Sequence, residues 1–301
     1  MDKKIYIKMY RDEVDNYISE KNFVKTTEKK EYKDQTRNIN KLVSSIRSKF
    51  ESNVLGNKEF NNKQIVDELL KIYYTSYIMM LEYRNKFWPY DNMAFSRRIG
   101  EFWEPLCKIP FYHSLKKLQI FEPKTFSEIE IKHKEKMKFL ISNLISNVEE
   151  GNKVFNLYDE VWNYINSESI QLALDLHFIQ DDIYYNIDYK SGFSSNEKGN
   201  TNRLLMVAGI DESLKDLFNE KHKNILLVRQ KEYENNHYLI RLKDSSKWEV
   251  FCGDDAYEKI KHFTGFDLKE WISSNVNWES DLSRDFYEYL HDKDLLRYLE
   301  W

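Results

Sequence analysis

Residues 171–203 read QLALDLHFIQDDIYYNIDYKSGFSSNEKGNTNR, and this stretch decides the fold. In its first half, apolar side chains alternate with polar ones over residues 172–178, as expected of a strand with one buried face. The alternation restarts after Asp181 and Asp182 and continues over residues 183–190. Two alternating runs on either side of a two-residue polar turn predict a β-hairpin.

The register of this hairpin determines where its acidic side chains lie. If Gln180 pairs with Ile183, Asp175 falls directly across from Asp188, and Lys190 follows two residues later on the same face. Opposed residues hold their Cβ atoms about 4.5–5.5 Å apart, where two like charges are destabilising. A hard divalent cation between the carboxylates would remove this conflict. A slip of one residue would instead place the two acids on opposite faces.

Composition and charge narrow the class of protein. The chain has 301 residues, of which 32% are charged, and its mean hydropathy of -0.72 predicts a soluble protein. The net charge of -4 does not indicate a nucleic-acid-binding protein by itself, although a local basic cleft remains compatible with it. Residues 1–50 contain 13 Lys and Arg against 8 Asp and Glu, a net charge of +5, so this part could contribute to a polyanion-binding surface.

Neither the cysteines nor the apolar segments indicate secretion or membrane insertion. Cys107 and Cys252 are far apart and form no metal-ligand pattern, which favours a reduced, cytoplasmic chain. The first residues lack the apolar core of a signal peptide. The most apolar run, residues 72–81, is shorter than the roughly 20 residues that span a bilayer.

The remaining pattern predicts an α+β fold, with a mixed β-sheet flanked by helices as an α/β core and a large N-terminal helical region. We expect a helical region over residues 1–90, an α/β core over 91–270, for which the resemblance described below implies a catalytic role, and a helical tail over 271–301. The predicted helices include residues 62–85, a helix from Ser96 that ends before Pro110, and residues 153–165, 204–218, 254–263 and 267–274, followed by a packing helix at the C-terminus. The predicted strands after the hairpin are residues 224–230, 237–242 and 248–252.

Two helices carry acids that could reach a metal site. On the helix that follows Ser96, Glu101 and Glu104 lie three residues apart and share a face. Arg97 could pair with Glu101 on an ordinary surface helix, or the helix could lend Glu104 to a metal site and its arginines to phosphates. Glu160, on the predicted helix over residues 153–165, is a second candidate for an acid that reaches the metal site. Alternatively, it is an ordinary solvent-facing residue.

The segment after Lys190 is almost entirely hydrogen-bonding in character and is predicted to be a loop. Asparagine amides can pair with adenine edges, and Lys and Arg suit phosphate or guanine. The loop could therefore contact DNA, or it could be a mobile surface connection. The candidate DNA-binding residues are Ser194, Ser195, Asn196, Lys198, Asn200, Asn202 and Arg203.

Asp175, followed by the run Asp188-Tyr189-Lys190, resembles the motif of the PD-(D/E)xK nuclease superfamily, although Leu174 stands where that motif has proline. The resemblance covers about residues 96–265, and with the polar loop and large helical remainder the chain looks most like a type II restriction endonuclease. It implies that Asp175, Asp188 and the backbone carbonyl of Tyr189 bind Mg²⁺. It also implies that Lys190 orients or deprotonates a water, or neutralises the transition state, and that Glu104 completes the catalytic residues.

The resemblance thus implies a Mg²⁺-dependent, sequence-specific endonuclease of a restriction-modification system that hydrolyses phosphodiester bonds in double-stranded DNA. A palindromic site would imply a homodimer, because the two-fold axes of protein and DNA coincide. Two alternatives stay open, namely a DNA repair or junction-resolving nuclease of the same fold and a non-catalytic helical binding or scaffold protein. His177 shares the face of Asp175 and is expected to be a neighbour rather than a nucleophile or a base. In an ordinary hairpin, Lys190 would only balance Asp188 on a solvated face.

Overall fold

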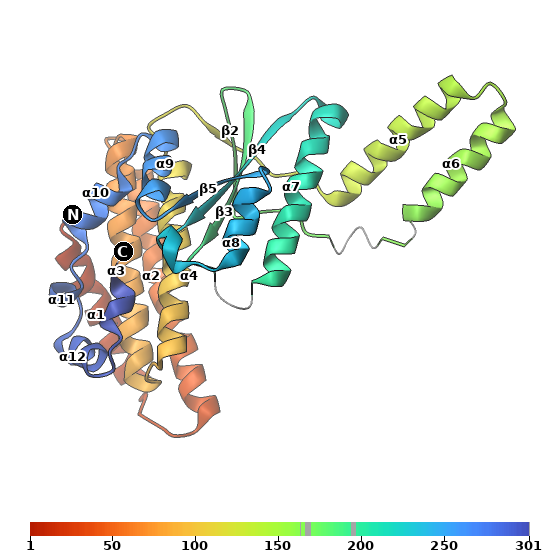
Figure 1. The fold of residues 1–301 in the computed structure, drawn as a ribbon. Helices are drawn as coiled ribbons and strands as arrows, with labels where there is room; N and C mark the ends of the chain where they lie inside the picture. Colours follow the sequence, from red (N-terminus) through yellow and green to blue (C-terminus); the bar gives the residue numbers. More distant parts are fainter. Residues whose placement is uncertain (163, 166–169, 194–196, 301) are drawn as a thin grey trace. The chain divides into compact units, whose positions relative to one another are not determined.

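The computed structural model describes residues 1–162, 164–165, 170–193 and 197–300, and the chain divides into two compact units (Figure 1). The helical unit comprises Met1–Lys117, Arg229–Lys231 and Cys252–Trp301. The sheet unit comprises Leu118–Val228 and Glu232–Phe251. The predicted α+β class is confirmed, and the boundaries predicted at residues 90 and 270 both fall within the helical unit.

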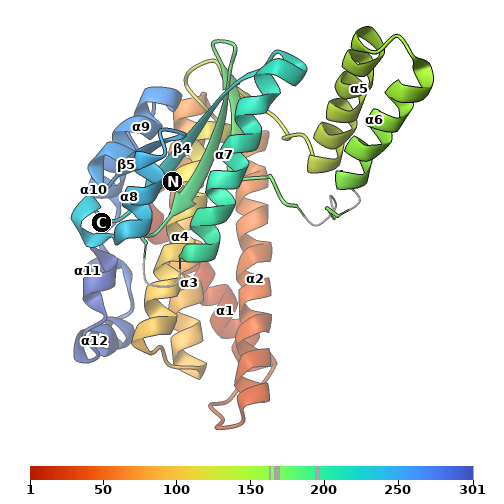
Figure 2. The ribbon, with the colours of Figure 1, turned by 45° about the vertical axis from the view of Figure 1, so that its right-hand side comes forward.

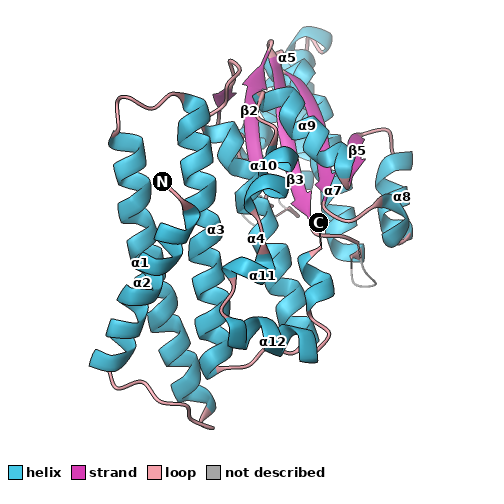
Figure 3. Ribbon diagram, turned by 90° about the vertical axis from the view of Figure 1, so that its left-hand side faces the viewer, coloured by secondary structure: helices cyan, strands magenta, loops and turns pink. Residues whose placement is uncertain are grey.

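In the helical unit, helix α3 (Asn62–Phe87) packs along both α1 (Lys3–Glu20) and α2 (Lys29–Gly56) (Figure 3). Asn61 begins α3 with a capping box, because its side chain accepts from the Gln64 amide while the Gln64 side chain accepts from the Asn61 amide. Most side chains of α3 are buried, so this helix is the centre of the unit's core. The helices are α1 Lys3–Glu20, α2 Lys29–Gly56, α3 Asn62–Phe87, α4 Asn92–Tyr112, α9 Asp254–Thr264, α10 Leu268–Asn275, α11 Trp278–Asp281 and α12 Arg284–Asp292, with a 3₁₀ turn at Leu296–Leu299.

Helix α4 is longer at both ends than the sequence predicts. Asp91, rather than Ser96, caps it by accepting from the Ala94 amide at 2.7 Å. The helix also continues past Pro110 to Tyr112. A proline inside a helix removes a hydrogen bond and costs about 3 kcal/mol. The buried apolar face of α4 continues through this point and offsets that cost, which is why the predicted end is wrong.

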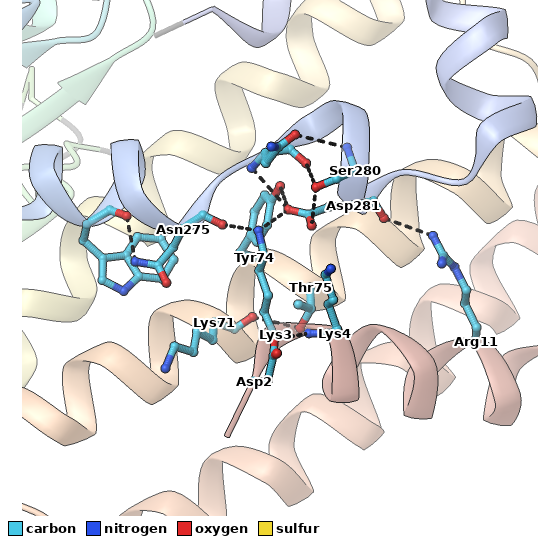
Figure 4. A network of polar contacts seen from close by, with 12 residues as sticks. Asp2, Lys3, Lys4, Arg11, Lys71, Tyr74, Thr75, Asn275, Ser280 and Asp281 are labelled. Atoms are coloured by element: carbon cyan, nitrogen blue, oxygen red, sulfur yellow. Dashed lines mark hydrogen bonds and ion pairs between the residues drawn. The ribbon is translucent and has the colours of Figure 1, made fainter.

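A buried carboxylate joins three separate segments of the helical unit (Figure 4). Asp281 is only 1% exposed, and its Oδ2 atom accepts from Lys3 Nζ at 2.6 Å and from the Tyr74 hydroxyl at 2.9 Å. The same oxygen accepts from the Asn277 amide at 3.2 Å, while Arg11 donates to the Asp281 carbonyl at 3.0 Å. One side chain therefore satisfies donors from α1, α3 and the start of α11.

The sheet unit contains a five-stranded sheet in the order β1-β2-β3-β4-β5. Strands β1, β2 and β3 pair antiparallel, whereas β3 and β4 pair parallel and are connected through α7, which packs against β4 (Figure 2). The strands are β1 Gln119–Ile120, β2 Leu176–Gln180, β3 Ile183–Lys190, β4 Lys221–Val228 and β5 Trp248–Cys252. The helices are α5 Phe126–Leu144, α6 Val148–Trp162, α7 Lys198–Phe218 and α8 His237–Asp244, with a 3₁₀ turn at Glu232–Glu234.

The hairpin forms in the predicted register. Gln180 pairs with Ile183, and the pairing continues to Leu176 opposite Ile187. Asp181 and Asp182 both have positive φ, 51° and 59°, as a tight two-residue hairpin turn requires. Strand β2 begins four residues after the start of the predicted alternation, so the preceding residues reach the sheet as irregular chain.

One predicted strand, residues 237–242, is instead the helix α8. Asn236 caps this helix by accepting from the Tyr238 amide at 2.9 Å. Leu239 and Leu242, three residues apart, are its buried side chains. Over only six residues, the apolar positions fit both the period of two of a strand and the period of a helix. Here the Asn236 cap and the buried pair Leu239 and Leu242 stabilise the helix. The strand predicted at residues 248–252 is confirmed as β5, and the one predicted at 224–230 is β4, which begins earlier, at Lys221, and ends at Val228.

Candidate active site

Asp175 and Asp188 lie together at the end of the hairpin that is far from its turn. Asp175 immediately precedes β2, and one further step of the observed register places it opposite Asp188. Its Oδ2 atom accepts from the backbone amide of Tyr189 at 2.7 Å, which holds this carboxylate beside the carboxyl end of β3. The shared face therefore follows from the hairpin register.

Two cationic side chains contact Asp188. The Lys190 ammonium forms an ion pair with Asp188 Oδ2 and donates to the Tyr189 carbonyl at 3.1 Å. The Arg203 guanidinium, from α7, lies 3.4 Å from Asp188 Oδ1. The Asp188 side chain is 1% exposed, and burial raises its pKa to about 6, with the charge of Asp175 adding to the rise and both cations opposing it.

The oxygens present suit a hard divalent cation. Lys190 Nζ contacts both an Asp188 oxygen and the Tyr189 carbonyl oxygen. These two oxygens, which are expected to bind Mg²⁺, therefore already bind the same ammonium group. Within the described ranges, no three His, Cys, Asp or Glu side chains gather closely enough to hold a metal. Two carboxylates and a carbonyl still fit Mg²⁺, which keeps several waters and needs only one or two protein carboxylates.

The accessory acids are engaged elsewhere or exposed. Glu104 lies on α4 in the helical unit and accepts from Lys108 Nζ at 2.6 Å. Glu101 pairs with Arg97 at 2.8 Å, which confirms the ordinary surface pair that the sequence predicts. Glu160 is exposed on α6. A third carboxylate beside Asp175 and Asp188 stays a prediction.

The polar segment after β3 is only partly a loop. Helix α7 begins at Lys198, six residues before the predicted start at Leu204. Thr201 and Leu204 are buried on its inner side, and this packing outweighs a local composition typical of loops. The prediction that residues 198–203 form a loop is therefore wrong.

The predicted DNA-binding residues have different environments. Arg203 points back to Asp188, and Asn200 donates to the Glu197 carboxylate at 3.1 Å. Lys198 and Asn202 are exposed on the first two turns of α7 and are free to reach a ligand outside the unit. The other predicted members, Ser194, Ser195 and Asn196, lie outside the described residues.

A second, buried polar layer lies beside the candidate site under α7. Asn186, two residues before Asp188 on β3, donates through Nδ2 to Asp211 Oδ2 at 3.0 Å and to Asn224 Oδ1 at 3.1 Å. The same nitrogen lies 3.0 Å from His222 Nδ1. His177 Nε2 accepts from the Leu174 amide at 2.9 Å, so its Nδ1 carries the hydrogen donated to Asn186 Oδ1 at 2.8 Å. Both ring nitrogens of His177 are thus occupied, in agreement with its expected role as a neighbour.

Sequence reasoning missed Asp211 and His222 in this layer. His222 and Asn224 occupy alternate positions of β4, and Asn224 opens the apolar run that predicts a buried strand. A polar residue in such a run is a usable signal, because buried polar groups require partners. Asp211 gives no such signal, because its partners Asn186 and Asn224 lie on β3 and β4 and meet α7 only in the folded chain.

Asp211 is expected to make the stability of the protein depend on pH. Burial raises its pKa to about 7, against the hydrogen bonds from Asn186 and Asn224. The folded chain therefore holds this proton between about pH 4 and pH 7 while the unfolded chain loses it, so the contribution of Asp211 to the free energy of unfolding falls as pH rises through this window. We expect Asp211→Asn, which keeps the shape without the charge, to be about 2–4 kcal/mol more stable than the parent protein at pH 8 and equally stable near pH 4.

Urea denaturation at a series of pH values between 4 and 8 measures this difference. Asp216→Asn, an exposed position on the same helix, provides the control and should follow the parent protein throughout. Parallel stability profiles for Asp211→Asn and the parent protein would contradict the prediction.

Comparison of the chain with models of protein families, with curated proteins and with solved structures finds no match. In the part of the chain that the structure describes, no helix is long and apolar enough to cross a membrane. The assignment of function therefore depends on the geometry of the site.

Proposed function

We propose that this protein is a Mg²⁺-dependent endonuclease that hydrolyses phosphodiester bonds in double-stranded DNA. The observation that carries the proposal is the position of the Lys190 ammonium, which is held by Asp188 and the Tyr189 carbonyl, while Asp175 accepts from the backbone amide of Tyr189. Two carboxylates, a carbonyl and a lysine on one face of a hairpin form a site for a cation and a phosphate together.

Each side chain of the candidate site would have a separate role in the reaction. Asp175 and Asp188 would orient the bound cation through their oxygens, together with the Tyr189 carbonyl. Mg²⁺, when bound, would lower the pKa of a coordinated water and neutralise charge on the phosphate. Lys190, displaced from Asp188, would hold that water in line with the phosphorus as an ammonium, or take up its proton as a neutral amine, and Arg203 would contact a non-bridging phosphate oxygen. The water oxygen would form a bond to phosphorus while the bond to the leaving oxygen breaks, and that oxygen would take a proton from solvent water.

The substrate class follows from what surrounds the site. Lys198 and Asn202 are exposed on the two turns of α7 next to Arg203, where they could contact phosphate and base edges. We therefore propose sequence-specific cleavage of the restriction type by a cytoplasmic homodimer. A repair or junction-resolving nuclease would use the same catalytic residues, and cleavage that follows DNA structure rather than sequence would distinguish it.

Metal removal tests the proposal directly. We expect the purified protein to cut plasmid and phage DNA into discrete fragments with Mg²⁺, to stop when EDTA is present, and to recover when excess Mg²⁺ is added. Titration calorimetry should show one Mg²⁺ site per chain. A folded protein that binds neither Mg²⁺ nor Mn²⁺ and leaves many DNA substrates uncut would reject the proposal and identify the Asp188 contacts as structural ion pairs.

A further inference from the structure

Helices α5 and α6 form an antiparallel hairpin whose contacts are mainly with each other. Gly151 lies against Ile141 near the connection, and Lys134 pairs with Asp159 at 2.7 Å further along. At the opposite end, the Phe126 ring lies 6.2 Å from the ring of Trp162. Figure 2 shows the two helices side by side along their lengths.

This hairpin leaves an unusual amount of apolar surface in solvent. Only Ile129, Ile141 and Gly151 are buried in its two helices. Along α6, the exposed residues Val154, Leu157 and Val161 follow one another at spacings of three and four, which is the repeat of a helix that packs against another helix. Tyr164 lies just past the end of α6, in a turn where its amide donates to the Val161 carbonyl at 3.3 Å. We name the following set the apolar stripe, whose side chains are between 42% and 87% exposed: Leu140, Leu144, Val154, Leu157, Val161 and Tyr164.

The members of the apolar stripe that belong to α5 and α6 lie on one side of the two-helix layer. At 100° per residue, Leu140 and Leu144 lie 60–100° to one side of Ile141, which faces α6. The α6 members Val154, Leu157 and Val161 lie 60–120° from Gly151 in the same rotational sense. Because the helices are antiparallel, equal rotation away from their shared contact leads to the same side of the hairpin.

We propose that a second copy of this chain covers the apolar stripe, so that two α5–α6 hairpins form a four-helix bundle about a two-fold axis. A surface that meets its own copy about such an axis needs no second complementary surface elsewhere on the chain. Short antiparallel helix pairs commonly associate in this way. The proposal rests on the exposed surface of the hairpin and is independent of the proposed nuclease activity.

The available area agrees with a dimer. An aliphatic side chain offers roughly 60–120 Å² and a tyrosine about 200 Å². At the observed exposures, the stripe provides on the order of 450 Å² per chain and about 900 Å² for both copies. That sum already exceeds the roughly 800 Å² that bounds most incidental contacts, and the polar rim would bring it near the 1,200 Å² of a stable interface.

Charge favours a second copy over a nucleic acid or an anionic membrane as the occupant. Helix α6 carries four acidic residues and one lysine, a net charge of -3, whereas α5 carries four lysines and three glutamates, a net charge of +1. A two-fold arrangement can place α5 of one copy against α6 of the other and so bring opposite charges together. An anionic surface would be repelled by α6.

Light scattering coupled to size exclusion, with protein loaded from about 1 to 100 µM, tests the proposal. The full chain should elute with twice the mass of the 36.6 kDa monomer. Leu157→Glu/Val161→Glu places two charges within the stripe and should weaken dimerisation at least about 100-fold. Because both side chains are exposed in the hairpin, circular dichroism and the melting temperature of the isolated monomer should change little.

Asn152→Glu/Asn156→Glu is the matched control, since it adds the same two charges at the same spacing to exposed positions on the other side of α6. This variant should remain dimeric. A parent chain that stays monomeric up to about 100 µM would overturn the proposal and leave the stripe to a different partner. A Leu157→Glu/Val161→Glu variant that dimerises as tightly as the parent chain would also overturn it.

Discussion

Asp188→Asn should lower the rate of DNA cleavage by at least about 1,000-fold, the effect expected when a group that stabilises the charged transition state is lost. The asparagine side chain has the same shape but is neutral, so it holds a divalent cation much less tightly than the carboxylate. Its carbonyl oxygen can still accept from Lys190 or Arg203, which keeps the local hydrogen bonding. The loss should therefore appear in activity and Mg²⁺ affinity, with the fold intact.

Single-turnover cleavage of a plasmid under saturating enzyme measures this loss, and calorimetry measures Mg²⁺ binding. Asp182→Asn in the turn of the same hairpin is a suitable control, because asparagine tolerates the positive φ of that position and the side chain is exposed. Cleavage by Asp188→Asn at a rate close to that of the parent protein would remove this residue from the active site.

Asp281→Ala is expected to produce the largest loss of stability, about 3–5 kcal/mol, because it removes one partner of a buried ion pair. Lys3 would keep a largely buried ammonium without its carboxylate, and the Tyr74 hydroxyl and Asn277 amide would each lose an acceptor. Helices α1 and α11 would then lose the side chain that joins them to α3.

Urea denaturation followed by tryptophan fluorescence provides the free energy of unfolding for this variant. Asp285→Ala, an exposed acid in the first turn of α12, should cost less than about 1 kcal/mol through its favourable interaction with the helix terminus. If Asp281→Ala is no more destabilising than this control, the buried network does not contribute as the contacts indicate.

The β2–β3 hairpin could be predicted because residues close together in the sequence determine it. A strict period of two on both sides of Asp181 and Asp182 leaves one register that keeps the apolar faces together, and that register is observed. The adjacency of Asp175 and Asp188 follows from it, as does the place of Lys190. Helix ends were less predictable, because a single cap decides them, as Asp91 does for α4.

The partners that come from α7 could not be predicted. Arg203 reaches Asp188 and Asp211 reaches Asn186 only because α7 packs across the face of the sheet that carries both strand residues. No spacing in the sequence encodes that packing. The start of α7 could not be predicted either. Its first residues have a composition typical of loops, and the burial of Thr201 stabilises them as a helix.

The two cationic side chains beside Asp188 affect the net charge of the candidate site. Lys190 and Arg203 together offset the charges of the Asp175 and Asp188 carboxylates, so this cluster of four side chains carries little net charge. A site with no excess negative charge does not repel a polyanion, so under the proposed function a phosphodiester would be able to approach it ahead of the metal. If Mg²⁺ then displaces the two side chains, their released charge attracts the phosphate, so metal and DNA would each tighten the binding of the other.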